Sequence, residues 1–220
     1  MTIAREFPGK CQLTLVDLNR ELLSEAAAFG KQHGIDVQIE PGDVNKYNIT
    51  PGYYDLIVCR SSLHHFMMLE RVLNEIRNGL TDDGDLLVIG EWIGRNGLQI
   101  YPETEKIANE LFRALPARLR KNAYTGEVDK THPNIDHSVD CFEAVRSEEI
   151  LPALLEVFPR AEYVAYDALL TLFFDFRYGP NYNLDDEGDR EIIQRITVLD
   201  VDYVQRNILR PTALFGRFGR

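Results

Sequence analysis

The chain has 220 residues, of which 45% are hydrophobic and 27% are charged, and its formal net charge at pH 7 is −11. This composition is typical of a globular protein with a substantial core, and the negative charge argues against nonspecific binding to nucleic acid or to an anionic membrane. The three cysteines are too few and too far apart for a disulfide framework or a zinc motif. Because the sequence has neither a membrane-spanning apolar stretch nor a signal-peptide pattern, we expect a cytoplasmic protein.

The first half of the chain alternates short apolar runs with helical patterns. Residues 4–7 are typical of the end of a helix, since Pro8 and Gly9 follow and neither residue continues a helix. Asn19 is a good N-cap for the helix that comes next. Strands that alternate with helices at this spacing predict βαβ units, and therefore a mostly parallel sheet with helices on both faces. The predicted strands are 11–16, 37–39, 55–58 and 86–89, and the predicted helices are 20–32 and 70–80.

The second half of the chain is less regular. Its polar segment 124–137 is long for a loop in a compact domain, which predicts a lid or a poorly ordered excursion. Ser147 is the predicted cap of a helix over residues 148–158. Strand patterns at residues 162–172 and 212–218 predict an antiparallel edge at the C-terminal side of the sheet. Further helices are predicted over residues 103–115 and 189–207.

Two acidic residues directly follow predicted strands. Asp17 lies in the stretch LTLVDLN, and Asp43 lies in PGDVN after the next strand. A carboxylate at the carboxyl end of a strand can accept hydrogen bonds from both hydroxyls of a ribose. Taken alone, Asp17 is equally typical of an acid near a helix N-terminus, and Asp43 of a turn residue.

The stretch YYDLIVCRSSLHHF, residues 53–66, combines a short apolar run with a histidine-rich loop. The run Leu56–Val58 is rich in β-branched residues and suits a strand that is buried on both faces. In open α/β sheets, ligands bind outside the carboxyl ends of the strands. The stretch therefore predicts a central strand and its active-site loop.

The order of these features resembles the class I S-adenosylmethionine-dependent methyltransferases. After YDLIVCRSSLHHF, the stretch LERVLNEIRNGLTDDGDLLV is similar to that family's helix, Pro-Gly-Gly turn and strand, with an Asp-Asp-Gly turn at residues 82–84 instead. The resemblance covers about residues 4–94. It implies a Rossmann-like α/β fold with S-adenosylmethionine as the cofactor, in one domain. Residues 1–97 would form its cofactor-binding portion, and residues 98–220 its helical lid and C-terminal sheet.

The resemblance also implies roles for single residues. Asp17 would hold the ribose and Leu18 would pack on the adenine. Asp43 would accept a hydrogen bond from the adenine amino group, with Val44 beside it. The residues implied at the methionine end of the cofactor are Cys59, Arg60 and Ser61.

One part of the family's pattern is missing from this sequence. The family's first strand is followed by a glycine-rich loop, whose backbone approaches the methionyl part of the cofactor as only glycine permits. The chain contains no G-x-G-x-G. We therefore expect either a truncated sequence or a degenerate form that has lost its hold on the cofactor. The strand before Asp17 would then pair directly with residues 55–58, or an added strand would fill the gap. An exposed edge left there would favour a homo-oligomer.

Three side chains are candidates for catalysis. His64 and His65 carry imidazoles that titrate in the right range for a general base, which a hydroxyl or amine acceptor requires. Alternatively, one histidine caps the following helix and the other packs under the lid. Glu91, at the carboxyl end of its strand, would orient a substrate or a histidine, or would pair with a neighbouring arginine, Arg95 or Arg146.

The remaining aromatic and histidine residues give weaker indications. Trp92, Tyr101 and the segment 169–178 are aromatic enough to line an apolar substrate pocket, although core packing is the commoner role of such residues. His132 and His137 form no metal-binding set with a nearby cysteine, so no metal site is predicted.

Three functions follow, in order of preference. The first is the transfer of the sulfonium methyl group to an oxygen or nitrogen of a small-molecule substrate. The second is a non-catalytic or truncated domain that keeps the fold but no longer binds the cofactor. The third is a nicotinamide-dependent oxidoreductase, which would also use Asp17 but needs the same missing loop.

Overall fold

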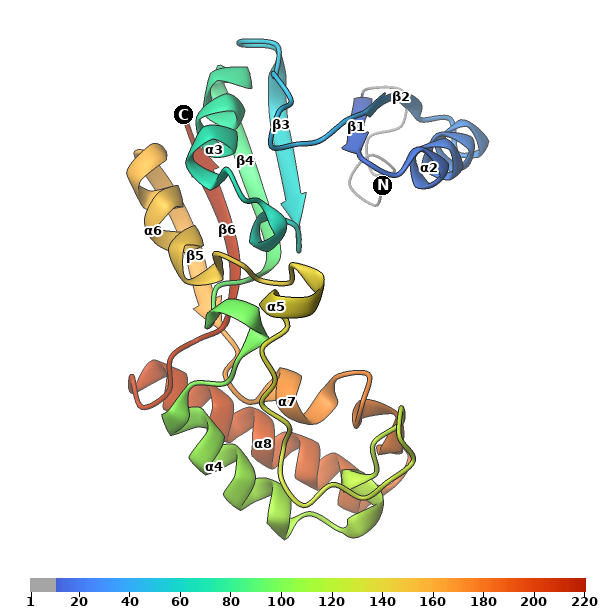
Figure 1. The fold of residues 1–220 in the computed structure, drawn as a ribbon, viewed down its shortest axis with the longest axis vertical. Helices are drawn as coiled ribbons and strands as arrows, with labels where there is room; N and C mark the ends of the chain where they lie inside the picture. The colour runs from blue at the N-terminus through green and yellow to red at the C-terminus, as the bar shows by residue number, and fades with distance from the viewer. Residues whose placement is uncertain (1–10) are drawn as a thin grey trace.

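The computed structural model describes residues 11–220 and contains two separate sheets (Figure 1). The predicted helix end at residues 4–7 lies outside these residues. The smaller sheet pairs β1 (Gln12–Asp17) with β2 (Asp36–Pro41) in parallel, and α2 (Arg20–Gln32) connects them. Asn19 caps α2 as predicted, since its side chain accepts from the N–H groups of Glu21 and Leu22 at 3.0 and 3.1 Å.

The larger sheet has four strands in the order β3-β4-β6-β5. β3 runs parallel to β4, and β6 is antiparallel to both of its neighbours. The predicted fold class is therefore confirmed: a mixed α/β structure with a mostly parallel sheet, flanking helices and an antiparallel C-terminal edge. The strands are β3 (Tyr54–Arg60), β4 (Leu80–Trp92), β5 (Arg160–Tyr166) and β6 (Ala213–Gly219).

The predicted turn at residues 82–84 lies inside β4. The register shows how the strand accommodates these residues, because Tyr54 pairs with Leu80 whereas Leu56 already pairs with Asp85. The intervening residues bulge out of the ladder, so the turn interrupts the pairing without ending the strand.

Among the described residues, no strand joins β1 to β3. β1 pairs with β2 and β3 pairs with β4, and the extended segment after β2 links the two sheets (Figure 1). Both sequence-based alternatives, direct pairing of β1 with β3 and an added strand between them, are therefore wrong for residues 11–220. β3 is an edge strand of its sheet in the described residues, not the central strand that was predicted. Nor is it buried on both faces, since Leu56 and Val58 are 42% and 44% exposed. Backbone groups on such an edge are open to pairing with another strand.

Two helices, α3 (Leu69–Gly79) and α6 (Ser147–Val157), pack together with the four-stranded sheet around one core. Apolar residues of α3 recur at helical spacing and face β4. Ser147 does not cap α6 as predicted; the N-cap position is Arg146, and the Ser147 hydroxyl donates to the carbonyl of Gly94 at 2.9 Å. The fully buried members of this core include Leu69, Leu73, Leu86, Val88, Ile150, Leu154, Leu214 and Phe218.

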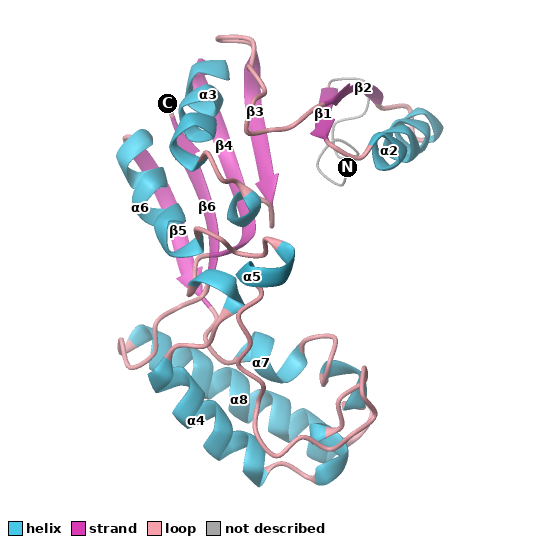
Figure 2. Cartoon of the chain, in the orientation of Figure 1, coloured by secondary structure: helices cyan, strands magenta, loops and turns pink. Residues whose placement is uncertain are grey.

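A second core lies among α4 (Pro102–Ala114), α7 (Leu170–Phe174) and α8 (Glu187–Gln205), which form a helical layer beyond the carboxyl end of β3 (Figure 2). The predicted strand at residues 162–172 ends at Tyr166, and a helix replaces its last part. Shorter helical turns are η1 (Leu63–His65), η2 (Asn96–Leu98), η3 (Ala117–Arg120), α5 (Ser138–Cys141) and η4 (Gly179–Asn181). None of the helices in residues 11–220 combines the length and the apolar character needed to cross a membrane.

Candidate functional site

The strands β3 and β4 end at the same edge of the larger sheet, and η1 follows β3 there. Ser61 turns the chain away from β3 with a positive φ of 43°. Its N–H donates to the carbonyl of Ile89 at 3.1 Å, and its hydroxyl donates to the carbonyl of Gly90 at 2.9 Å. These bonds to β4 place the histidines of η1 directly beside Glu91.

Glu91 is the buried anchor of this site. Its side chain is fully buried and accepts from the N–H groups of Ser62, Leu63 and His64 at 2.9, 2.9 and 3.1 Å. It also accepts a hydrogen bond from Nδ1 of His64. Burial raises the pKa of Glu91, but the bonds from the His64 ring and from the backbone amides outweigh this effect, so its pKa lies below the usual value. Glu91 is therefore a carboxylate at neutral pH.

His64 lies between two carboxylates. Nδ1 faces Glu91, and Nε2 lies 3.2 Å from Oε1 of Glu143. Burial lowers the pKa of His64, but the hydrogen bonds and negative charges of both glutamates outweigh it and raise the pKa above 6.5. Glu91 also fixes the ring so that Nε2 is the nitrogen directed away from the sheet.

His65 completes the cluster from the solvent side. Its Nδ1 lies 3.6 Å from Oε2 of Glu143, and the two histidine rings are 4.1 Å apart between centroids. The side chain of His65 is 46% exposed. Neither histidine caps α3, whose N-cap position is Met68.

Glu143 is the residue of this site that the sequence did not predict. It follows α5, far along the chain from the histidines (Figure 1). Phe142 and Ala144, on either side of it, both have positive φ values, 55° and 56°. The Val145 N–H donates to the carbonyl of His64 at 3.2 Å, which holds this segment against η1. In the sequence, Glu143 lies between the polar segment 124–137 and the predicted helix over residues 148–158, and nothing there indicates which acid reaches the histidines.

Of the readings offered for Glu91, the one in which it orients a histidine agrees with these contacts. Pairing with an arginine does not. Arg95 donates to the carbonyl of Ile100 at 3.0 Å, and Arg146 forms ion pairs with Glu70 and Glu149.

The two acids expected at the adenosine end of the cofactor lie at one end of the smaller sheet. The backbone carbonyl of Asp17 accepts from the Gly42 N–H at 3.0 Å, so Asp17 ends β1 next to the turn after β2 that carries Asp43. The Asp17 carboxylate accepts from the Asn19 N–H at 2.7 Å. Hydrogen bonds from the side chain and backbone of Asn45 hold the pKa of Asp43 below its usual value.

Asn45 links this end of the smaller sheet to the N-terminus of α3, the helix that follows the histidine loop. Its Nδ2 donates to Asp43 at 3.0 Å, while its Oδ1 accepts from the Met68 N–H at 2.9 Å. Arg71 donates to the carbonyls of Asn45 and Tyr47 at 3.0 and 3.2 Å, which strengthens the same connection. The structure thus connects Asp43 to the N-terminus of α3 through one intervening side chain.

The other residues implied by the resemblance are more scattered. Leu18 is 73% exposed, and Val44 packs against the core of the larger sheet. Cys59 is buried in that core, and burial raises the pKa of its thiol to about 12, so it is not a reactive group. Arg60 is exposed, and the hydroxyl of Ser61 is bonded to β4.

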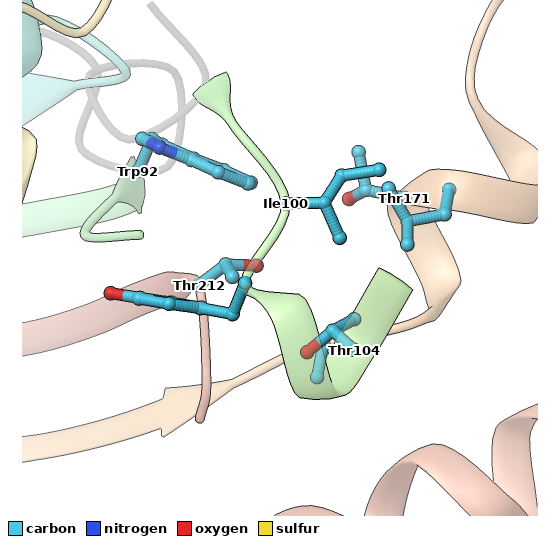
Figure 3. Close-up of a pocket in the computed structure, with 8 residues that line it drawn as sticks. Trp92, Ile100, Thr104, Thr171 and Thr212 are labelled. Carbon is cyan, nitrogen blue, oxygen red and sulfur yellow. The ribbon is translucent and has the colours of Figure 1, made fainter. Parts of the chain in front are cut away.

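Trp92 and Tyr101 line a small enclosed cavity of about 10 Å³ between the sheet and the helical layer (Figure 3). Ile100, Thr104, Thr171 and Thr212 surround it. This volume is enough for about one water molecule and too small for a substrate. In the segment 169–178, Phe173 and Tyr178 are buried in the core. Phe174 and Phe176 instead line an open cleft of about 840 Å³ among α7, η4 and α8.

Comparisons with known proteins identify the class to which this chain is similar in sequence and fold. Residues 1–84 match the sequence model of a methyltransferase domain. YcgJ, an uncharacterized methyltransferase of Bacillus subtilis, is 24% identical over 110 residues, which make up 49% of this chain and 42% of YcgJ. The chain thus spans less than half the length of this curated relative.

A solved structure shows the same fold over most of the chain. An S-adenosylmethionine-dependent methyltransferase from Mesorhizobium loti superposes with a TM-score of 0.50 at 16% sequence identity, covering 95% of this chain and 80% of that one. The family match over residues 1–84 supports the resemblance to methyltransferases, and this structure shows that the chain shares their fold.

The described residues fit the two ends of that cofactor unequally. At the adenosine end, the carboxylates of Asp17 and Asp43 follow the carboxyl ends of paired parallel strands and can accept hydrogen bonds from hydroxyl and amino donors. At the methionine end, the sequence supplies no glycine-rich loop, and the edges of β1 and β3 that would flank one are apart. The fit is therefore good for adenosine and incomplete for methionine.

Proposed function

We propose that the protein transfers the methyl group of S-adenosylmethionine to an oxygen or nitrogen of a small molecule, with His64 as the general base. The observation that carries this proposal is the buried Glu91 carboxylate, which fixes the His64 ring at the carboxyl ends of β3 and β4. Ligand sites in open α/β sheets lie at this edge.

On this proposal, Asp17 and Asp43 hold the adenosine, and the bound cofactor supplies an electrophilic methyl group. The connection from Asp43 through Asn45 to Met68 supports this arrangement, because Met68 begins α3, the helix that follows the histidine loop in the chain. Alignment of donor and acceptor would supply most of the rate.

His64 would take the proton that the acceptor loses. Its Nε2, which lies 3.2 Å from Oε1 of Glu143, can accept a proton once the ring is neutral, and both glutamates stabilise the imidazolium that forms. Because the pKa of His64 is raised, the neutral ring becomes abundant only above pH 6.5. His65 is the more exposed of the two and is assigned to contact with the acceptor.

Calorimetric titration with S-adenosylmethionine tests the proposal. We expect saturable binding to the full chain and a loss of affinity on Asp17→Ala. Asp36→Ala is the matched control, because Asp36 is an exposed acid at the opposite end of the same strand pair. Absence of both heat and a shift in melting temperature would reject cofactor binding.

A second candidate is a methyltransferase-like domain that does not bind the cofactor. Two observations favour it: the lack of a G-x-G-x-G sequence and the separation of β1 from β3 in the described residues. The same titration distinguishes the two candidates, since this one predicts no binding by the wild-type chain or by either variant.

A further inference from the structure

We propose that His64, His65 and Glu143 form a binding site for a divalent transition-metal ion, with Zn²⁺ as the ion to test. One ligand atom from each residue lies within 4.8 Å of the other two. Imidazole nitrogen and carboxylate oxygen are common zinc ligands. The proposal goes beyond methyl transfer and does not depend on cofactor binding.

The spacing of the ligand atoms suits a tetrahedral ion. Metal–ligand bonds of about 2.0–2.1 Å at tetrahedral angles separate neighbouring ligands by roughly 3.3–3.4 Å. The distance from His64 Nε2 to Glu143 Oε1 is 3.2 Å, and that from His65 Nδ1 to Glu143 Oε2 is 3.6 Å. The two values lie on either side of the expected separation, so small side-chain adjustments would admit an ion.

Glu91 orients the His64 ring so that Nε2 can bind a metal ion. It accepts from Nδ1, which leaves the Nε2 lone pair directed at Glu143. A carboxylate behind a ligating histidine is the usual way in which proteins fix the tautomer and raise the basicity of the ligand. Three backbone N–H groups hold Glu91 in place independently of any ion. With two neutral imidazoles, Glu91 and Glu143 together balance a charge of 2+.

The backbone assembles the site before an ion binds. The segment that carries Glu143 is joined to η1 by the bond from Val145 N–H to the His64 carbonyl, and to η2 by the bond from Gly97 N–H to the Ala144 carbonyl at 2.9 Å. Positive φ values at Phe142 and Ala144 are unfavourable for residues other than glycine, and these bonds help to maintain them.

The site is also open on one side. The side chains of His65 and Glu143 are 46% and 30% exposed, so a fourth ligand can enter from solvent. A zinc site with three protein ligands and one open position is the arrangement used for chemistry, in contrast with a closed structural site. Proton and ion compete for the Nε2 lone pair of His64, so its role as a base belongs to the metal-free protein.

The experiment is a calorimetric titration of the full, chelator-treated chain with Zn²⁺, repeated with Co²⁺ and followed by visible absorption. We expect one equivalent to bind and Co²⁺ to give the absorption of a four-coordinate site. Glu143→Gln and His65→Ala should each lower the affinity at least tenfold. His33→Ala, which removes an exposed histidine at the end of α2, should leave the affinity unchanged.

Glu143→Gln keeps the shape of the side chain, and His65→Ala alters a half-exposed residue, so one of the two should remain folded even if the other does not. Circular dichroism checks both variants. The proposal is overturned if the wild-type chain binds no stoichiometric ion, if a folded variant at position 65 or 143 binds as tightly as wild type, or if His33→Ala weakens binding equally.

Discussion

The carboxylates at the two ends of the site are held in different ways. Glu91 is buried and accepts four hydrogen bonds from η1, whereas Asp17 is exposed and Asp43 half-buried, and both accept mainly from residues a few positions away. A buried carboxylate is expensive to leave unpaired, so it fixes the histidine loop. Removing an exposed acid usually changes the stability of the fold little, and its carboxylate is available to bind a ligand. The histidine end is thus preorganised, and the acidic end is connected to it mainly through Asn45.

The largest expected effect is on catalysis at the preorganised end. In an assay of methyl transfer to screened hydroxyl and amine acceptors, His64→Ala should lower kcat by about 100- to 10,000-fold, because it removes the general base. His33→Ala is the control for loss of a histidine elsewhere. If His64→Ala retained more than a tenth of the wild-type kcat, the base would have to be another group.

Removing the Glu91 carboxylate should have the next largest effect, which is on the stability of the fold. Glu91→Ala leaves a buried imidazole and three N–H groups without their partner, so we expect a loss of about 3–5 kcal/mol in the free energy of unfolding. Urea denaturation measures it. Asp17→Ala, at the exposed end, should change the same quantity by no more than about 0.5 kcal/mol. Equal losses in the two variants would contradict the contrast between the two ends.

The loss on Glu91→Ala should also depend on pH. The lowered pKa of Glu91 contributes stability above 4.5 that disappears as the pH falls through the folded value. The raised pKa of His64 contributes stability below 6.5 that disappears as the pH rises through its folded value. The difference between wild type and Glu91→Ala should therefore be greatest between pH 4.5 and 6.5.

The smallest effect is expected at the connection between the two ends. Asn45→Ala removes the acceptor of the Met68 N–H and one donor to Asp43, so it should cost about 1 kcal/mol and speed hydrogen exchange at Met68. Asn48→Ala is the matched control, since the Asn48 side chain accepts from Arg71 but does not contact Met68. Unchanged exchange at Met68 would show that other contacts hold the two sheets together.

Local patterns in the sequence predicted much of this fold. The Asn19 cap, the alternation of strands and helices and the antiparallel C-terminal strands all depend on residues close together in the chain. Strand neighbours do not, and the proposed pairing of β1 with β3 was wrong because an apolar run does not specify which strand lies beside it.

The positions of the candidate site residues were predicted in part, while their roles remain predictions. His64, His65 and Glu91 were expected at one edge of the sheet because each follows a predicted strand, and the structure places them there. Glu143 was missed because it lies in irregular backbone after α5, where sequence periodicity gives no orientation. Cys59 was assigned to the cofactor, but it is a core residue, because its side chain points toward α3 and α6.

The central claim is that Glu91 and His64 form a charged pair that controls this site, and the titration of the His64 ring tests it most directly. Nitrogen NMR of the labelled protein should give a pKa for His64 above 6.5 in wild type and a lower value in Glu91→Gln. A wild-type pKa at or below 6.5, or one that Glu91→Gln leaves unchanged, would contradict the account.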